Sequence, residues 1–280
     1  MIRVILDGRS GNNMFQYAAG RAIAIQHHTN LVLDGSWADV RHARQFEQLL
    51  RLPLNASYER RFSLAKRALR KMIAIQPETL HRGQVHIERY PKPDPAFYAL
   101  PDNSLLIGFF QMPFYFNEIE PLLRKELDLT QLTLPPASLR FEDRLRAGAT
   151  VSVHVRRGDY VGIDSTQCLD ADYHERALQH FRDRIPDVRF CVFSDDIPWC
   201  RARYSGPEFV FCELEGARGD PLHDLRLMSS CHHHIVVNSS YSWWGAWLNP
   251  SPDKIVIVPS MWMTNVPSNY VFPPEWTRIP

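Results

Sequence analysis

Cysteine is scarce in this sequence of 280 residues, and its distribution excludes two kinds of scaffold. The five cysteines are odd in number, and no two of them stand at Cys-x-x-Cys spacing. A disulfide framework or a zinc site therefore does not organise the fold, and we expect free thiols in a reducing compartment. Residues 1–7 form a strand-like run and not a basic leader followed by an apolar stretch. We therefore expect no signal peptide and a cytoplasmic location.

Long apolar runs and a strong charge of one sign are also absent. No stretch approaches the roughly 20 apolar residues that are needed to span a bilayer. The formal net charge of +1 argues against a dedicated nucleic-acid binder, which usually carries a large basic excess. One basic stretch, residues 58–72, has the pattern of an amphipathic helix. It fits either peripheral contact with the inner membrane surface or the solvated face of a packed helix.

The order of predicted elements is that of an α/β protein. A strand over residues 1–7, a turn over 8–13, a helix from Met14 and a strand over 31–34 form a Rossmann-like unit, although its loop lacks the Gly-x-Gly-x-x-Gly spacing of a dinucleotide site. Further strands are expected at 105–110, 150–155, 189–194, 235–238 and 254–258, with helices at 137–147, 172–184, 221–230 and 242–248. We expect two Rossmann-like domains, residues 1–136 and 137–280, facing one another across a cleft.

Two adjacent arginines follow the apolar strand 150–155, within the segment His154-Val155-Arg156-Arg157-Gly158-Asp159. Alternation along a strand sends His154 and Arg156 to the same face. Ligands of open α/β sheets bind just beyond the carboxyl ends of strands, and a guanidinium matches the paired oxygens of a diphosphate. The alternative is an arginine pair that neutralises acidic neighbours in a loop. The pattern favours a diphosphate-linked ligand.

Paired acids, Asp195 and Asp196, follow the strand 189–194 of the same predicted sheet. Such acids can bind a metal or accept hydrogen bonds from a purine or a ribose. Asp196 also precedes Ile197-Pro198, which is a typical helix start. We expect one acid to cap this helix and the other to contact a ligand.

Hydroxyl-bearing residues connect the strand 235–238 to the helix that follows it. Asn238, Ser239, Ser240 and Ser242 lie at this helix start, where free N–H groups and the helix dipole favour an anion. Simple capping by Ser240 or Ser242 is the alternative, but three serines exceed what one cap needs, so we expect phosphate binding.

Trp243 and Trp247 share a helix face and are expected in the core. Asp224 is expected to brace the serine-rich loop. The consecutive residues His232–His234 cannot all point at one ion and do not predict a metal site.

Together these segments resemble the inverting α1,2-fucosyltransferases, which make H-type blood-group linkages in bacteria and animals. The resemblance rests on Gly8–Gln16, His154–Tyr160, Phe193–Asp196, Asp224–Met228 and Asn238–Leu248. The opening loop departs from the family's usual Gly-Gly-x-Gly-Asn-Gln. Its sequence, Gly8-Arg9-Ser10-Gly11-Asn12-Asn13, is similar to the loop of the more distant protein O-fucosyltransferases, in which the arginine and the asparagine approach the donor.

The resemblance implies a GT-B-like fold, GDP-fucose as donor, a galactose-terminated oligosaccharide as acceptor, and no metal or other cofactor. The donor would lie on residues 137–280 and the acceptor on residues 1–136. In this scheme His154 and one of Asp195 and Asp196 hold the nucleoside. Arg156, aided by Arg157 or Arg9 and by the donors around Ser239, Ser240 and Ser242, neutralises the diphosphate. Gly11 and Asn12 accompany Arg9 at the donor.

Two carboxylates are candidates for the general base that accepts the acceptor's proton. The related α1,6-fucosyltransferases are thought to place a carboxylate five residues beyond the aspartate of the motif, an offset occupied here by Asp164. Asp159 is the other candidate. Two further functions stay open from the sequence. One is an O-fucosyltransferase or another GDP-sugar transferase, and the other is a catalytically silent module that binds a GDP-sugar.

Overall fold

The contacts of the chain divide it into two units, Met1–Asp128 and Leu129–Pro280, here called unit 1 and unit 2. A computed structural model describes residues 1–37, 46–60, 80–82, 84–88, 92–158, 169, 172–213, 220–264 and 266–280. Pro135 and Pro136, the expected domain boundary, lie within unit 2 at the start of a helix. Most of the basic segment 58–72 lies outside the described residues.

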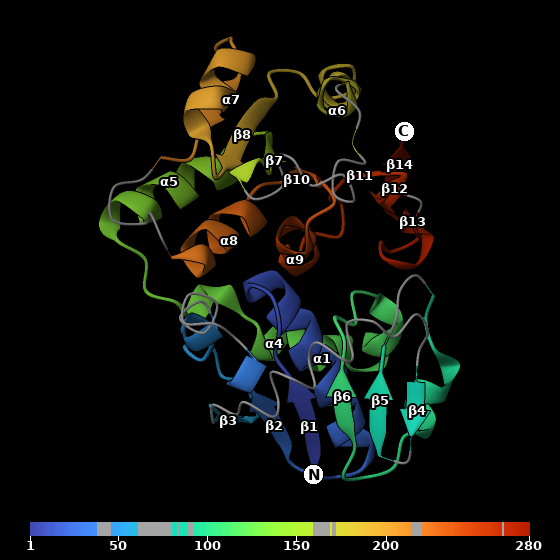
Figure 1. The fold of residues 1–280 in the computed structure, drawn as a ribbon. Helices are drawn as coiled ribbons and strands as arrows, with labels where there is room; N and C mark the ends of the chain where they lie inside the picture. The colour runs from blue at the N-terminus through green and yellow to red at the C-terminus, as the bar shows by residue number, and fades with distance from the viewer. Residues whose placement is uncertain are drawn as a thin grey trace. The chain divides into compact units, whose positions relative to one another are not determined.

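Unit 1 is built on a six-stranded sheet with the strand order β3-β2-β1-β6-β5-β4 (Figure 1). Neighbouring strands are parallel except for β4 and β5, which are antiparallel. The strands are β1 (Ile2–Ile5), β2 (Leu31–Asp34), β3 (Ser57–Glu59), β4 (Leu80–Arg82), β5 (Val85–Ile87) and β6 (Leu105–Ile107). The helices are α1 (Ser10–Gln26) and α4 (Glu120–Glu126), with short 3-10 turns η1 (Gly35–Trp37), η2 (Pro95–Ala99), η3 (Pro113–Tyr115) and η4 (Asn117–Ile119).

Two predicted boundaries in unit 1 are wrong. Helix α1 begins at Ser10 and not at Met14, because Asn13 already donates its backbone N–H to the carbonyl of Arg9 and closes the first turn. Strand β6 ends at Ile107 and not at residue 110, because Phe110 has φ of +52° and cannot continue an extended strand.

Unit 2 is built on a six-stranded parallel sheet with the order β14-β11-β10-β7-β8-β9. Figure 1 labels these strands except β9. Its strands are β7 (Thr150–Val155), β8 (Arg189–Ser194), β9 (Phe209–Phe211), β10 (His233–Ile235), β11 (Val256–Pro259) and β14 (Thr277–Ile279), with a separate antiparallel pair, β12 (Met261–Met263) and β13 (Val266–Pro267). Its helices are α5 (Pro136–Arg146), α6 (Tyr173–Arg182), α7 (Ile197–Arg203), α8 (Pro221–Ser229) and α9 (Ser240–Leu248), with 3-10 turns η5 (Leu129–Gln131) and η8 (Ser268–Tyr270). The prediction of an α/β fold with two Rossmann-like units is confirmed.

The two faces of the unit 2 sheet carry separate hydrophobic clusters. Val151, Val153 and Val155 of β7 pack on the same face as Phe181 of α6. Phe193 of β8 belongs to the other face, in a cluster that includes residues of α5 and α8. Because side chains alternate along a strand, Ser152 and His154 of β7 belong to this second face as well. His154, the first residue of the arginine motif, therefore points to the second face, as the alternation predicted for residues 150–155 requires.

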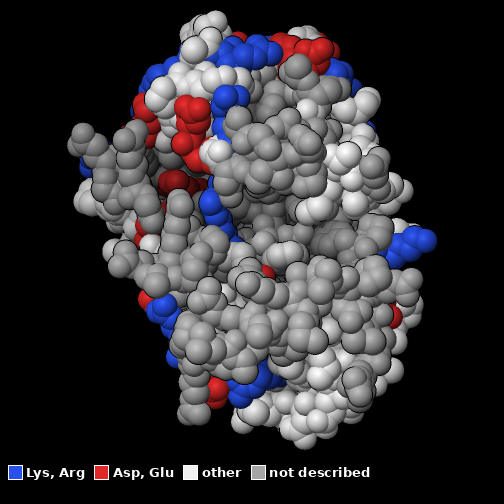
Figure 2. All heavy atoms as spheres, viewed as in Figure 1, with Lys and Arg blue, Asp and Glu red and all other residues white. Residues whose placement is uncertain are grey.

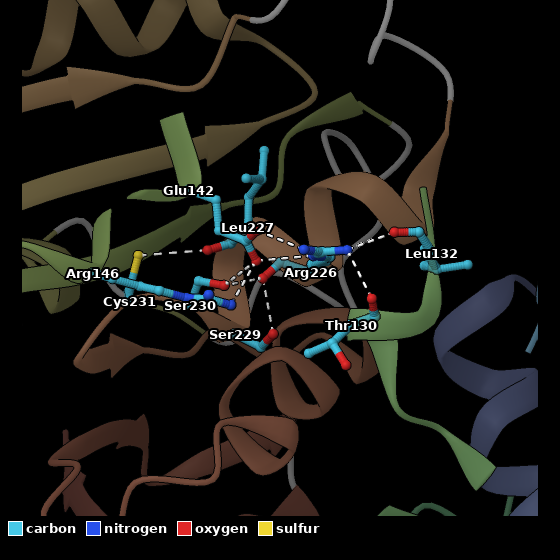
Figure 3. Close-up of polar contacts among 9 residues, drawn as sticks. All are labelled: Thr130, Leu132, Glu142, Arg146, Arg226, Leu227, Ser229, Ser230 and Cys231. Carbon is cyan, nitrogen blue, oxygen red and sulfur yellow. Dashed lines mark hydrogen bonds and ion pairs between the residues drawn. The ribbon is translucent and has the colours of Figure 1, made fainter. Parts of the chain in front are cut away.

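A buried ion pair joins α5 to α8 beneath the second face (Figure 3). Arg226 donates to both carboxylate oxygens of Glu142, at 2.9 and 2.7 Å, and points on its other side toward the carbonyls of Thr130 and Leu132. Ser230 adds a hydroxyl bond of 2.9 Å to the same carboxylate. The network satisfies both buried charges and fixes the position of α8.

The three consecutive histidines have separate partners around strand β10, which begins at His233 and not at Ile235 as predicted. His232 Nδ1 lies 3.1 Å from the hydroxyl of Thr150, and His233 Nδ1 accepts a backbone N–H at 3.0 Å. His234 is fully buried between Ser152 and Asn249, at 2.7 and 2.8 Å. The pairing of His233 and His234 with β7 explains why the strand starts early.

The expected packing of the tryptophans on α9 is confirmed. The rings of Trp243 and Trp247 are stacked, with centroids 5.9 Å apart, and both side chains are buried. Among the described residues, no helix is long and apolar enough to cross a membrane. Basic and acidic side chains are interspersed on the coloured part of the surface in Figure 2, in keeping with the balanced composition.

Candidate functional site

The topology of unit 2 has a switch point between β7 and β10. From β7 the sheet continues through β8 and β9 on one side, and through β10, β11 and β14 on the other. In open α/β sheets, ligands bind outside the carboxyl ends of the strands at such a switch point. The loop after β7 begins with Arg156, and the segment after β10 runs through residues 236–239 to α9. Two of the three predicted motifs therefore follow the two strands at this switch point.

The two arginines that follow β7 each pair with one of the acids that follow β8. Arg156 Nη1 lies 3.2 Å from Asp195 Oδ2, and Arg157 Nε lies 3.3 Å from Asp196 Oδ2. Asp195 also accepts the backbone N–H of Arg157 at 2.9 Å. Because β7 and β8 are neighbours, the four side chains form a neutral cluster in which carboxylates orient both guanidinium groups.

The absence of a side chain at position 158 makes this cluster sterically possible. A Cβ atom on Gly158 would lie only 2.6 Å from Oδ2 of Asp195. This close approach explains why the motif has glycine directly after its arginines.

The second arginine of the motif is held on helix α7. The guanidinium of Arg157 lies 4.0 Å from the centroid of the Trp199 ring, in a cation–π contact. Asp196 accepts the backbone N–H of Trp199 at 3.1 Å and so caps α7. The sequence predicted that one of the two acids caps this helix. Asp196 is that residue, and Asp195 contacts Arg156.

His154 is a neutral imidazole at the end of β7. Burial, reinforced by the positive charge of Arg156, lowers the pKa of His154 to about 3. Its side chain is on the face that carries α8, and its ring centroid lies 5.8 Å from that of Tyr241 on α9. Within the described residues, Nδ1 of His154 has no hydrogen-bond partner although it is buried. A buried nitrogen of this kind indicates a place where a ligand or a water completes the hydrogen bonding.

The hydroxyl-bearing residues at the start of α9 have different surroundings. Ser239 is the N-cap residue, and its side chain makes no capping hydrogen bond. Ser242 is buried and donates its hydroxyl to the carbonyl of Ser239 at 3.3 Å, so this hydroxyl serves the helix itself. Asn238 and Ser240 flank Ser239. The N–H groups of the first turn have no intrahelical acceptor, and they place the positive end of the helix dipole after β10.

Helices α8 and α9 begin side by side. The hydroxyl of Tyr241 donates to the carbonyl of Pro221 and ties the first turns together. Burial, with a smaller contribution from Asp220, raises the pKa of Asp224 to about 6. The charge of Asp224 also helps to raise the pKa of Tyr241, for which burial is the main cause. The structure places the charge of Asp224 within reach of Tyr241 in the first turn of α9, and the bracing of the serine-rich loop by Asp224 stays a prediction.

The predicted donor residues of unit 1 lie in the loop after β1 and in the first turn of α1. Arg9 is the N-cap residue of α1, and Gly11 is buried in the first turn. Asn12 Oδ1 accepts a hydrogen bond of 2.6 Å from Nε2 of Gln111, which follows the neighbouring strand β6. The two candidate bases, Asp159 and Asp164, lie outside the described residues, and their roles stay predictions.

Sequence reasoning missed three side chains around these loops. Trp199 holds Arg157, Gln111 holds Asn12, and Glu88 accepts two backbone N–H groups from the segment that precedes Gln111. Each contact joins residues that are far apart in the chain, and none of the three has a local motif. The sequence Gly-Phe-Phe-Gln at 108–111, with a polar residue directly after the predicted strand 105–110, is the one signal that could have drawn attention to Gln111.

Comparison with known proteins identifies relatives along the whole chain. Residues 61–280 match the family model of glycosyl transferase family 11. An alpha-1,2-colitosyltransferase of Escherichia coli is 31% identical, over 98% of this chain and 97% of the relative. The O-antigen biosynthesis glycosyltransferase WbnK of Escherichia coli is 28% identical, over 98% of this chain and 99% of the relative. The galactoside 2-alpha-L-fucosyltransferase Sec1 of Mus musculus is 33% identical, over 46% of this chain and 36% of the relative.

Solved structures that align with this chain have much lower sequence identity. Fucosyltransferase NodZ from Bradyrhizobium aligns with a TM-score of 0.49 and 13% identity, over 89% of this chain and 93% of that one. The ADP-heptose lps heptosyltransferase II of E. coli aligns with a TM-score of 0.48 and 11% identity, over 99% of this chain and 89% of that one.

Proposed function

Since the chain belongs to glycosyl transferase family 11, we propose that it transfers L-fucose from GDP-fucose to the 2-hydroxyl of a terminal galactose, with inversion to an α1,2 linkage. The names of two relatives support the linkage, because one is an alpha-1,2-colitosyltransferase and another is a galactoside 2-alpha-L-fucosyltransferase. The observation that carries the proposal is that Arg156 and the start of α9 follow the two strands at the switch point of unit 2.

The chemical demand of this reaction is the neutralisation of the leaving diphosphate. As the bond between C1 of fucose and the phosphate oxygen lengthens, negative charge builds on the β-phosphate and positive charge on the sugar ring. We assign Arg156 to that phosphate, aided by the N–H groups around Ser239 and Ser240. The pairing with Asp195 orients the guanidinium before the donor binds. Arg157, which is stacked on Trp199, adds a second positive charge next to Arg156 in the chain.

The nucleoside is assigned to the second face of the same sheet. His154 is neutral and has a buried Nδ1 that needs a partner, so it can hydrogen-bond a neutral group without placing a further charge beside Arg156. The resemblance assigns Asp195 or Asp196 to the nucleoside as well. Both carboxylates also contact arginines. Because Asp196 caps α7, we assign the nucleoside to Asp195. The further assignment of Arg9, Gly11 and Asn12 to the donor comes from the resemblance.

No metal is required in this proposal. The paired acids that could hold a divalent cation, Asp195 and Asp196, each contact a guanidinium. That arrangement suits an arginine-based site better than a cation site, because a bound metal would have to displace or repel both arginines. Positive charge for the leaving group then comes from Arg156 and from the dipole of α9.

The general base is assigned to Asp164, with Asp159 as the alternative. The acceptor hydroxyl loses its proton late in such a reaction, so a base of ordinary carboxylate strength is sufficient. We propose a galactose-terminated oligosaccharide as acceptor. The function of one relative in O-antigen biosynthesis supports a glycan of that kind.

A second candidate concerns the sugar that is transferred. The relative with 31% identity is a colitosyltransferase, so a colitosyl group is the natural competitor of fucose at this site. Initial rates of GDP release with GDP-fucose and with the corresponding GDP-linked colitose, in the presence of a galactose-terminated acceptor, separate the two. We expect GDP-fucose to give the higher kcat/KM. A higher kcat/KM with the colitosyl donor would mean that colitose is the transferred sugar. If neither GDP-sugar releases GDP, the proposed function is contradicted.

A further inference from the structure

Unit 1 has a switch point of its own, between β1 and β6. The sheet continues from β1 through β2 and β3 on one side, and from β6 through β5 and β4 on the other. The two loops at the carboxyl ends of these strands are cross-linked by polar side chains. Gln16 accepts the backbone N–H of Asp7 at 3.2 Å and donates to the carbonyl of Gly108 at 2.9 Å. Gln111 donates to Asn12 at 2.6 Å.

The buried carboxylate of Glu88 holds the second of these loops. Glu88 follows β5 and is 3% exposed. Its Oε2 accepts the backbone N–H groups of Phe109 and Phe110, at 2.9 and 2.8 Å. A Cβ atom at Gly108 would lie 2.6 Å from Cβ of Glu88 and 2.7 Å from its Oε2. Glycine at 108 is therefore the residue that lets the carboxylate reach the loop.

The loop that Glu88 holds contains a strained residue. Phe110 has φ of +52°, a conformation that a bulky side chain rarely adopts. Its buried ring packs against His86, Phe97 and Tyr115, with centroids 5.9, 5.7 and 5.3 Å away. Strain of this kind persists where the surroundings impose it, and it occurs preferentially at functional sites. The next residue in the chain is Gln111, which contacts Asn12.

We propose that Glu88 is a positioning residue for the transfer reaction: by holding the strained turn at Phe110, it keeps Gln111 against Asn12 and so orients the side-chain amide of Asn12 toward the substrate. The proposal rests on the proposed function, which assigns Asn12 to the sugar-nucleotide. A hydrogen bond from Gln111 to Oδ1 makes the amide nitrogen of Asn12 the group that serves as a donor to an oxygen of the transferred sugar. Glu88 acts through Gln111 and does not itself contact substrate.

Steady-state kinetics of E88A, E88Q and Q111A in the full-length protein test this role. E88A and Q111A should each lower kcat by about tenfold or more, with the Kd for GDP within about twofold of the parent value, because a small displacement of Asn12 affects the reacting geometry and not nucleotide binding. E88Q should recover most of the activity, because an amide oxygen can still accept both N–H groups. The double variant E88A/Q111A should be no slower than E88A, because both changes break the same chain of contacts.

E126A is the matched control. Glu126 is also buried in unit 1, where it accepts hydrogen bonds from Tyr17 and Arg21. Its loss should lower the melting temperature but leave kcat and KM within about twofold. Kinetics of E88A and Q111A within twofold of the parent, or an equal fall of kcat in E126A, would overturn the proposal. If E88A does not fold, Q111A carries the same test.

Hydrogen–deuterium exchange separates failure of this inference from failure of the proposed function. E88A and Q111A should increase exchange in residues 7–13, whereas E126A should not. This readout needs no turnover. If the parent protein transfers no fucose but residues 7–13 respond as expected, the proposed function fails and the linkage through Gln111 stands. If residues 7–13 exchange at the parent rate in both variants, the positioning role is wrong whatever the enzyme transfers.

Discussion

The guanidinium of Arg156 lies 3.2 Å from the carboxylate of Asp195, across the carboxyl ends of two neighbouring parallel strands. A partly exposed pair of this kind contributes little to stability. Its consequence is geometric, because Asp195 also accepts the backbone N–H of Arg157 and so holds the loop that carries both arginines. A diphosphate that reaches Arg156 meets a guanidinium whose orientation is already set.

Removal of that guanidinium should abolish transfer and leave the fold intact. We expect R156A to lower kcat by at least about 100-fold, because a positioned positive charge is lost where charge develops in the transition state. R156K should recover only part of the activity, since an ammonium group cannot form the paired hydrogen bonds of a guanidinium. Rates of GDP release with saturating GDP-fucose measure both effects.

The matched control is R184A, because Arg184 is an exposed arginine of unit 2 that donates to the carbonyl of His180 at the end of α6. Its activity should equal that of the parent. If R156A retains activity within about tenfold of the parent, a loss of only ~1.4 kcal/mol, Arg156 does not have the assigned role.

Asp224 should make the protein less stable as the pH rises from about 4 to about 6. Its pKa is raised from 3.8 to about 6, so the folded state binds this proton more tightly than the unfolded state. The resulting stabilisation is complete below the unfolded pKa and is lost as the pH passes the folded pKa. D224N should therefore be more stable than the parent at pH 7.5, by about 3 kcal/mol, with a melting temperature several degrees higher.

Thermal unfolding of D224N and of the parent at pH 4 and pH 7.5 checks this prediction. The advantage of the variant should shrink toward pH 4, where the parent carboxyl is largely protonated in the fold. Equal melting temperatures at pH 7.5 would contradict it. D143N is a suitable control, because Asp143 is an exposed carboxylate on α5.

Loss of Arg226 should destabilise unit 2 strongly, because the buried carboxylate of Glu142 loses two guanidinium hydrogen bonds that Ser230 and the more exposed Arg146 do not replace (Figure 3). We expect R226A to reduce the free energy of unfolding by about 3–5 kcal/mol, as measured by urea denaturation. Replacement of both partners, in R226M/E142L, should recover much of the loss because no uncompensated charge remains. A double variant as unstable as R226A would show that the ion pair is not the source of the effect.

Acid should weaken the same ion pair. Burial tends to raise the pKa of Glu142, but hydrogen bonds from Arg226 and Ser230 outweigh it and lower the pKa below its usual value. The stabilisation is present above the unfolded pKa and is lost as the pH falls through the folded pKa. The stability difference between the parent and R226A should therefore narrow on acidification.

Transfer activity should persist in EDTA. Each of the paired acids contacts an arginine, and the positive charge for the leaving group is assigned to Arg156 and α9. We expect the rate of GDP release to be unchanged after dialysis against EDTA and to be insensitive to added magnesium or manganese. A loss of activity that either metal restores would redirect attention to Asp195 and Asp196.

The parts of the fold that the sequence predicted are those with a local periodic signal. Strand β7 was predicted with its observed bounds because its alternation and the motif that follows it are contiguous. Strands β3, β5 and β9 have three residues each, which is too few for a period of two to be recognised. Strand β10 was placed too late because its first two residues are histidines. The buried partners of His234 lie on β7 and directly after α9, and His233 accepts the backbone N–H of Ile255.

The candidate site was predictable where polar residues directly follow strands, and not where distant elements meet. The capping role of Asp196 could be foreseen from Ile197 and Pro198, but the stacking of Arg157 on Trp199 could not. Likewise, a turn at Phe110 depends on a carboxylate 22 residues earlier in the chain. Contacts of this kind depend on the strand order, which periodicity does not determine.

The most direct test of the central claim is the linkage formed in the enzyme's own product. Incubation with GDP-fucose and a β-galactoside acceptor, followed by methylation analysis and NMR of the purified product, gives both the substituted position and the anomeric configuration. We predict 2-substituted galactose that carries α-linked fucose. A fucosylated product without 2-substituted galactose, or one with a β linkage, would contradict the proposed function.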